Sequence, residues 1–153
     1  SKPLQDELQL QRHVESFREN EFLNKLLESM DDFIYRVVCD IATNCLVHVV
    51  LALDDVVFAA GSVATAAYYI SDGQCHYDCQ ASPESVKLCS LWMAEMCLWA
   101  PWIHLGHLVS QDISRLFILE VTTFAECIGK EPMSGKLAIQ HAREVVSRLD
   151  GSN

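Results

Sequence analysis

Glu120 is the residue of this sequence whose chemistry needs the most explanation, because it falls in an apolar helical stripe. The stripe consists of residues three or four positions apart, which share one face of a helix: Ile113, Phe117, Glu120, Phe124 and Cys127. No basic residue lies three or four positions from Glu120. A carboxylate on an apolar face costs several kcal/mol unless a donor pairs with it. We therefore expect Glu120 either to lie at the solvated edge of the stripe, or to meet a donor elsewhere in the fold or on another molecule.

A metal site is the second chemistry that the residue types allow. Cys75, His76 and Cys79 lie close together in one predicted loop, and His104 and His107 follow further along the chain. Two cysteines and two histidines suit zinc. However, the spacing C-x-x-x-C is unspecific, and no second tight pair of cysteines accompanies it. Ordinary loop and surface residues explain this group better, so we expect no bound metal.

A catalytic cysteine is the third possibility. Cys75 stands beside His76, but neighbours in sequence rarely place a thiolate and its base in a reactive geometry, and no glycine-rich oxyanion turn follows. The sequence also contains no phosphate-binding loop, dinucleotide fingerprint or nucleophile elbow. We expect neither an enzyme nor a cofactor.

The elements that must position these residues are predicted to be helices. Apolar residues recur at helical spacing along nearly the whole chain, and no segment shows the strict alternation of a half-buried strand. Asp31-Asp32, Asp54-Asp55 and Ser82-Pro83 are typical helix starts. The predicted helical segments are 4–29, 31–49, 54–70, 82–99, 103–109, 112–129 and 134–149, the last being basic on its outer face. The sequence therefore predicts an all-α fold of about seven helices, with an N-terminal helical segment over 1–30 and a helical domain over 31–150.

Composition limits the partners and the compartment. The formal net charge of −10 argues against nucleic acid, which is bound mainly by Lys and Arg. Five of the seven cysteines lie in apolar helical patterns, where we expect reduced core residues of an intracellular protein: Cys39, Cys45, Cys89, Cys97 and Cys127. The opening residues are polar, and the apolar runs 45–53 and 56–70 are too short to span a bilayer. We expect a soluble protein of the cytoplasm or nucleus with no membrane partner.

The region 31–128 resembles the cyclin box, the helical repeat of cyclins. The second helix of the box is similar to LALDDVVFAAGSVATAAYYI, and the third to SVKLCSLWMAEMCLWAP. The short fourth helix is similar to WIHLGHLV, and the fifth to ISRLFILEVTTFAECIG. The segment 1–30 matches the extra helix that often precedes the box.

The resemblance implies a non-catalytic subunit that binds and regulates a kinase of the cyclin-dependent class. In such cyclins a third-helix Lys and a fifth-helix Glu contact the kinase. Glu120 stands at the position of that Glu, whereas Met96 replaces the Lys and cannot donate a charged hydrogen bond. The implied partner-binding surface consists of Glu120, Met93, Met96, Trp99 and Trp102. The missing Lys favours the alternative, a helical scaffold or adaptor subunit of a larger assembly without a kinase.

Overall fold

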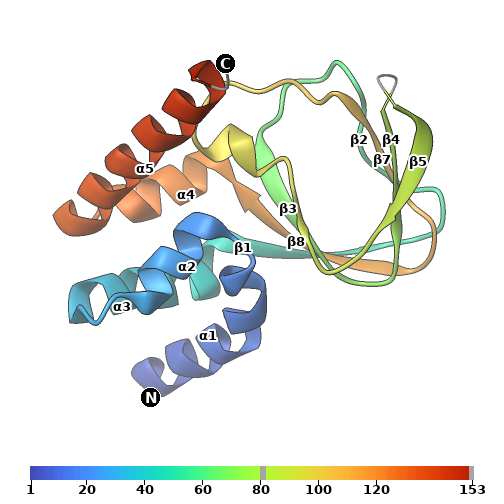
Figure 1. Ribbon diagram of the computed structural model, residues 1–153. Coiled ribbons are helices and arrows are strands. Elements are labelled where there is room, and N and C mark those ends of the chain that lie inside the picture. Colours follow the sequence, from blue (N-terminus) through green and yellow to red (C-terminus); the bar gives the residue numbers. More distant parts are fainter. Residues whose placement is uncertain (80–81, 152–153) are drawn as a thin grey trace. The chain divides into compact units, whose positions relative to one another are not determined.

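The fold contains helices and sheets in comparable amounts, so the predicted all-α class is wrong. The computed structural model describes residues 1–79 and 82–151. Within these residues lie the α-helices α1 to α5 and the strands β1 to β8 (Figure 1). The chain divides into two compact units. The helical unit comprises Ser1–Leu46, Leu98–Ala100 and the chain from Glu120 onward, and the sheet unit comprises Val47–Cys97 and Pro101–Leu119.

The helical unit is built from amphipathic helices that begin at side-chain caps. Its elements are α1 (Lys2–Arg18), α2 (Glu21–Glu28), α3 (Asp32–Asp40), the π-helix η1 (Ile41–Cys45), α4 (Val121–Gly129) and α5 (Pro132–Asp150). The Asn20 side chain accepts a hydrogen bond from the amide of Leu23, which starts α2. The Asp31 carboxylate accepts from the amides of Phe33 and Ile34, so the predicted cap at Asp31 is confirmed. Side chains that are at most 1% exposed form the core of this unit: Phe17, Phe22, Leu23, Leu26, Ile34 and Ile41.

The sheet unit contains two four-stranded sheets. One sheet has the order β1 (Leu46–Leu51), β8 (Ser114–Glu120), β3 (Ala66–Asp72) and β6 (Trp92–Met93). The other has the order β2 (Val56–Phe58), β7 (Gly106–Ser110), β4 (Cys75–Cys79) and β5 (Ser82–Leu88), and its strands lie side by side in Figure 1. The pairs β2–β7, β7–β4, β4–β5 and β3–β6 are antiparallel. The buried core of this unit is formed by Phe58, Ile70, Cys75, Leu108 and Leu116.

Continuous burial explains why strands were predicted as helices. Along β3 the successive residues from Ala66 to Ile70 are all buried or half-buried, so both faces of the strand are apolar. A strand covered on both faces loses the alternation that marks a half-buried strand. The predicted helix over 54–70 is therefore wrong. It is replaced by β2, a turn at Gly61 and β3.

Three further predicted helices contain strands. The predicted helix over 112–129 is the strand β8 followed without a break by α4. The start signal at Ser82-Pro83 opens β5 and not a helix. The short predicted helix over 103–109 is largely β7. Within the described residues, no helix is both long and apolar enough to cross a membrane.

Candidate functional site

Glu120 does not lie in an apolar helical stripe. It ends β8, occupies the N-cap position of α4 and is exposed to solvent, and its side chain makes no capping hydrogen bond. Ile113, predicted to share its helix face, is 68% exposed in the turn before β8. The stripe is broken because residues two positions apart share a face in a strand, whereas residues three or four positions apart share a face in a helix. The Glu120 carboxylate is therefore solvated and needs no buried partner.

The other predicted partner-binding residues fall in different units. Trp99 belongs to the helical unit, where its ring packs edge-on against Phe22, Phe124 and His141 at centroid distances of 4.8, 5.7 and 4.6 Å. Met93, Met96 and Trp102 belong to the sheet unit, where each is half-buried. The five predicted residues are thus not a single face of either unit, and Trp99 is engaged in holding its own core together.

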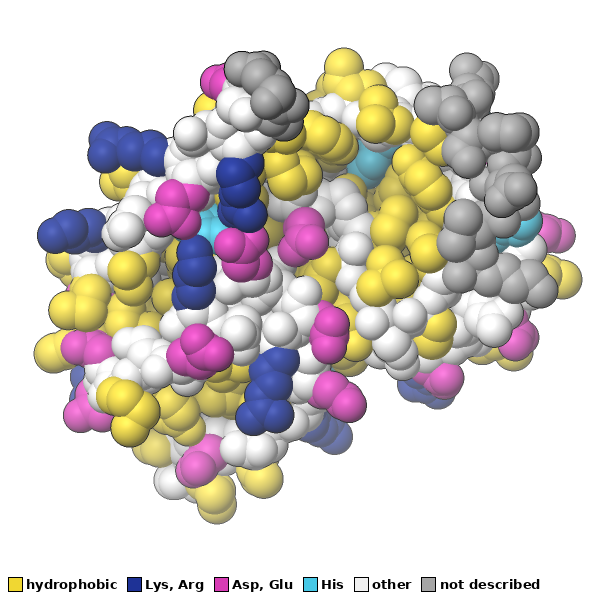
Figure 2. Space-filling model, viewed as in Figure 1, with side chains coloured by type: hydrophobic (Ala, Val, Ile, Leu, Met, Phe, Trp, Pro, Cys, Tyr) yellow, Lys and Arg dark blue, Asp and Glu magenta, His cyan; other side chains and the backbone are white. Residues whose placement is uncertain are grey.

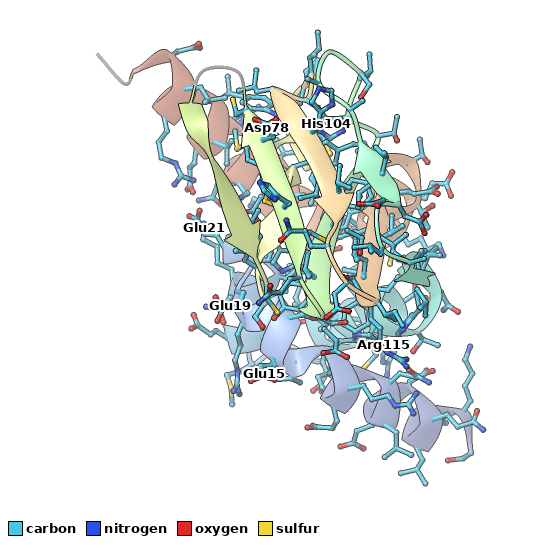
Figure 3. All side chains as sticks on the ribbon, turned by 90° about the vertical axis from the view of Figure 1, so that its right-hand side faces the viewer. Glu15, Glu19, Glu21, Asp78, His104 and Arg115 are labelled. Carbon is cyan, nitrogen blue, oxygen red and sulfur yellow. The ribbon has the colours of Figure 1, made fainter. Side chains whose placement is uncertain are left out.

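The residues considered for zinc are engaged separately within the sheet unit. The ring of His104 stacks on Phe58 at 3.7 Å between centroids, and the Nδ1 atom of His107 accepts a hydrogen bond from the amide of Ala60 at 3.1 Å. Figure 3 shows His104 and Asp78 toward the same end of the sheet that β7 and β4 share. In the described part of the chain, no three His, Cys, Asp or Glu side chains are grouped so that they could hold a metal ion.

Comparison with known proteins identifies a similar fold and no family. No protein-family model matches the sequence, and no curated protein matches it. The structure is similar to a solved domain. That domain is described as the N-terminal domain of a transcriptional regulator from Streptomyces coelicolor A3(2), with a TM-score of 0.64 and 16% sequence identity over 90% of this chain and 95% of the other. At this identity the likeness shows the fold alone, and that fold mixes helices with sheets. The resemblance to a cyclin box is therefore wrong, and with it the kinase-regulating function that it implied.

The surface of α5 is the most distinctive feature that the sequence analysis missed. One face of this helix is buried through Ser134, His141 and Val145. A second apolar stripe, which we call the outer stripe, runs along its side at spacings of three and four residues: Gly135, Ile139, Ala142, Val146 and Leu149. Ile139, Val146 and Leu149 are 56%, 38% and 45% exposed. The spacing is visible in the sequence, but only the structure shows which of the two stripes faces the core.

Basic side chains border the outer stripe. Lys136 and Arg143 lie two helical turns apart on its solvent side and, together with Ile139, line a shallow depression over Gly135. A Cβ atom added at Gly135 would meet only the carbonyl oxygen of Ile128, at 3.8 Å. The helix therefore has little side-chain bulk at this position. Neither Lys136 nor Arg143 has an ion pair within the residues that the structure describes. The predicted basic outer face of the last helix is thus accompanied by exposed apolar side chains.

Ion pairs fix α5 against α2. Lys25 Nζ lies 3.2 Å from Glu144 Oε2 and 3.1 Å from His141 Nδ1, and Arg148 donates to Glu21 at 3.2 Å. Figure 2 shows Lys and Arg side chains mingled with Asp and Glu side chains over these two helices. Each pair is largely exposed, so it contributes more to the orientation of α5 than to stability.

His141 makes the stability of the helical unit depend on pH. Burial, and next the charge of Lys25, lower the pKa of His141 below its ordinary value of 6.5, against the opposing effect of Glu21 and Glu144. The neutral ring is therefore favoured in the folded state. Because the folded pKa is depressed, the stabilisation is complete above pH 6.5 and is lost as the pH falls through the folded pKa.

We expect the urea midpoint of the wild type to decrease when the pH is lowered from about 7.5 to about 5.5. His141→Gln removes the titrating group and should reduce this decrease at equal protein concentration. The part that remains is expected from His104, whose pKa burial also lowers. An unchanged pH dependence in His141→Gln would show that protonation of His141 does not oppose folding.

Proposed function

We propose that this chain is a non-catalytic protein-binding domain whose outer stripe on α5 receives an acidic amphipathic helix of a partner protein. The observation that carries the proposal is the second apolar stripe on α5, which lies beside the face of the helix that is already buried. Surface helices of monomeric domains need one apolar face, and a second exposed one at helical spacing is typical of helix-in-groove binding. Gly135 and Ala142 leave room for a partner helix to approach between the larger side chains.

The positive charge beside the outer stripe determines which kind of partner helix fits it. Lys136 and Arg143 present unpaired positive charge beside the stripe, while the chain as a whole has a formal net charge of −10. A second copy of this acidic chain is therefore a poor electrostatic match, and so are nucleic acid and an anionic membrane. A partner helix with Asp or Glu beside its apolar residues pairs with both basic side chains. The seven free cysteines agree with an intracellular location, in the cytoplasm or nucleus.

The structural neighbour does not supply the partner. It is described as the N-terminal domain of a transcriptional regulator, and at 16% identity it shares the fold with this chain. The α5 surface alone supports the binding function proposed here.

Ile139→Asp is expected to weaken partner binding about tenfold or more, because it places a negative charge at the centre of the stripe. The matched control is Met133→Asp on the same helix, whose side chain is also exposed (46%) but lies outside the stripe. The partner is first identified with a photo-crosslinking residue at position 139 and, separately, at position 133. The crosslinked partner segment is then synthesised as a peptide, and its Kd is measured for wild type, both variants and Lys136→Glu/Arg143→Glu.

An acidic, helix-forming peptide that is weakened by Ile139→Asp and by the double charge reversal, but not by Met133→Asp, supports the proposal. Capture of a second copy of this chain, a peptide without acidic residues, or equal loss with Met133→Asp contradicts it. Charge-swapped peptides, in which Lys replaces the acids, should bind the double variant better than the wild type.

A further inference from the structure

The turn between β3 and β4 holds a backbone amide against the carboxylate that precedes it. Asp72 is the last residue of β3, and Gly73 follows it with a φ of 80°. The amide of Gly73 donates a hydrogen bond to Asp72 Oδ1 at 2.9 Å. The carboxyl carbon of Asp72 is bonded directly to this oxygen, so it lies beside the amide nitrogen. The turn therefore places a nitrogen nucleophile next to a carbon electrophile within one dipeptide.

The glycine leaves the approach of the nitrogen to the carboxyl carbon unobstructed. Gly73 has no side chain on the Cα atom beside its nitrogen, whereas a β-branched residue at this place would shield the nitrogen and stiffen the backbone. Its positive φ is the reason that a glycine occupies the turn. Asp72 is exposed, so solvent reaches its carboxyl group. The conformation of the turn and the reactivity of the dipeptide thus have the same origin.

Two other aspartates provide a comparison, because each has one of the two features. The amide of Ile113 donates to Asp112 Oδ1 at 2.8 Å, but isoleucine is β-branched. Asp150 precedes Gly151, but that glycine amide donates at 2.7 Å to a carbonyl oxygen in the last turn of α5. The sequence contains no third Asp-Gly pair. Within the residues that the structure describes, only Asp72 combines the amide contact with a following glycine.

We propose that Asp72 is a site of spontaneous covalent modification, at which the linkage to Gly73 rearranges to isoaspartate through a cyclic succinimide. The amide nitrogen attacks the carbon of the protonated carboxyl group, and the carboxyl hydroxyl leaves with the amide proton as water. The hydrogen bond that joins this proton to a carboxyl oxygen gives it its route. Water then opens the ring. Attack at the main-chain carbonyl gives isoaspartate, and attack at the other carbonyl restores aspartate. Because one water is released and one is consumed, the reaction needs no other reactant.

Isoaspartate lengthens the main chain by one carbon atom in a turn that is tightly bound to its surroundings. The carbonyl oxygen of Gln74 accepts from the Gln111 amide at 2.9 Å and from Ser114 Oγ at 3.1 Å. The Ser71 hydroxyl donates to the carbonyl oxygen of Arg115 at 3.0 Å. Even one added carbon atom on the glycine of this turn would lie 2.5 Å from a backbone oxygen. The lengthened turn must therefore move away from 111–115, and the sheet unit loses stability.

The test follows isoaspartate in the complete chain during several weeks at physiological temperature and neutral pH. Total isoaspartate is measured by methyl transfer from S-adenosylmethionine with an isoaspartyl O-methyltransferase, and its position by electron-transfer mass spectrometry of a digest. Isoaspartate should accumulate at Asp72 about tenfold or more faster than at Asp112 and Asp150. In urea, where the amide contact is lost, Asp72 and Asp150 should react at similar rates. Asp72→Glu is the matched control, because it keeps the charge but requires a larger ring, and it should give no signal at position 72.

The urea midpoint of the aged protein measures the effect on the turn. It should fall in the wild type as isoaspartate accumulates and stay constant in Asp72→Glu, whose fold is verified by circular dichroism. Isomerisation at Asp72 that is no faster than at Asp112 or Asp150 in the folded chain would overturn the proposal. An unchanged midpoint after isomerisation would contradict the predicted opening of the turn. None of these outcomes depends on the partner proposed for α5, because the reaction is measured in the isolated chain.

Discussion

Phe22→Ala is expected to lower the free energy of unfolding of the helical unit by about 4 kcal/mol, the usual cost of removing a buried aromatic ring. Phe22 is 1% exposed and contacts the rings of Trp99, Phe124 and His141 at 4.8, 6.1 and 5.2 Å. These rings come from three separate segments of the chain. The truncation therefore leaves a cavity that no single neighbour can fill, and the edge-on aromatic contacts are lost with it.

Urea unfolding followed by circular dichroism measures this loss. The matched control is Phe33→Ala in α3, whose side chain is 55% exposed and contacts Arg36 at 5.7 Å. It should cost less than about 1 kcal/mol, since little apolar surface is uncovered. Equal losses for the two variants would mean that the aromatic cluster around Phe22 is not the core of this unit.

The helical unit is the part of the fold that sequence reasoning predicts best. Its helices carry local signals, such as the capping Asp31, and each buries one face, so that the helical period is visible in the sequence. These signals act within a few residues and do not depend on the rest of the fold. The predicted end of the helix that starts at Asp32 was wrong, because LVHVVL continues the apolar pattern as β1.

The sheet unit could not be predicted from the same signals. Strands β3 and β8 are covered on both faces for much of their length. A short apolar run of this kind has the same sequence pattern in a buried strand as in a buried helix. Which of the two occurs depends on strand partners far along the chain, such as the pairing of Tyr69 with Trp92. The prediction of Cys89 as a core residue fails for a related reason, since it follows β5 and is exposed.

The candidate sites show the same division between local and distant information. The spacing of the outer stripe of α5 can be recognised in the sequence of that one helix, whereas its exposure to solvent is known only from the structure. The contact between Cys127 and Asp40 required much more. Cys127 was expected in the core and is buried, but nothing near it in the sequence indicates that its thiol meets the carboxylate of Asp40. Contacts between side chains from distant segments cannot be predicted from the periodicity of the sequence.

Gly73→Ala is expected to destabilise the sheet unit by about 3 kcal/mol, from two causes that add. Gly73 lies in the short turn between β3 and β4 with a φ of 80°, a conformation that residues with a Cβ atom rarely adopt. An added Cβ atom would also lie 2.5 Å from the carbonyl oxygen of Ile113 and 2.7 Å from the Cα atom of Ser114. Backbone atoms cannot rotate away as a side chain can, so the turn must open.

Gly61→Ala separates the two causes. Gly61 has a similar φ of 86°, but a Cβ atom added there meets nothing within 4 Å. It should therefore cost only the strain of the left-handed conformation, about 1 kcal/mol. Urea midpoints of the two variants, measured side by side, give the difference, which is the cost of crowding at the turn that joins the two sheets. If Gly73→Ala were no more destabilising than Gly61→Ala, the close approach of this turn to β8 would be incorrect, and with it the packing of the corner that Ser110 and Ser114 fill by hydrogen-bonding to one another.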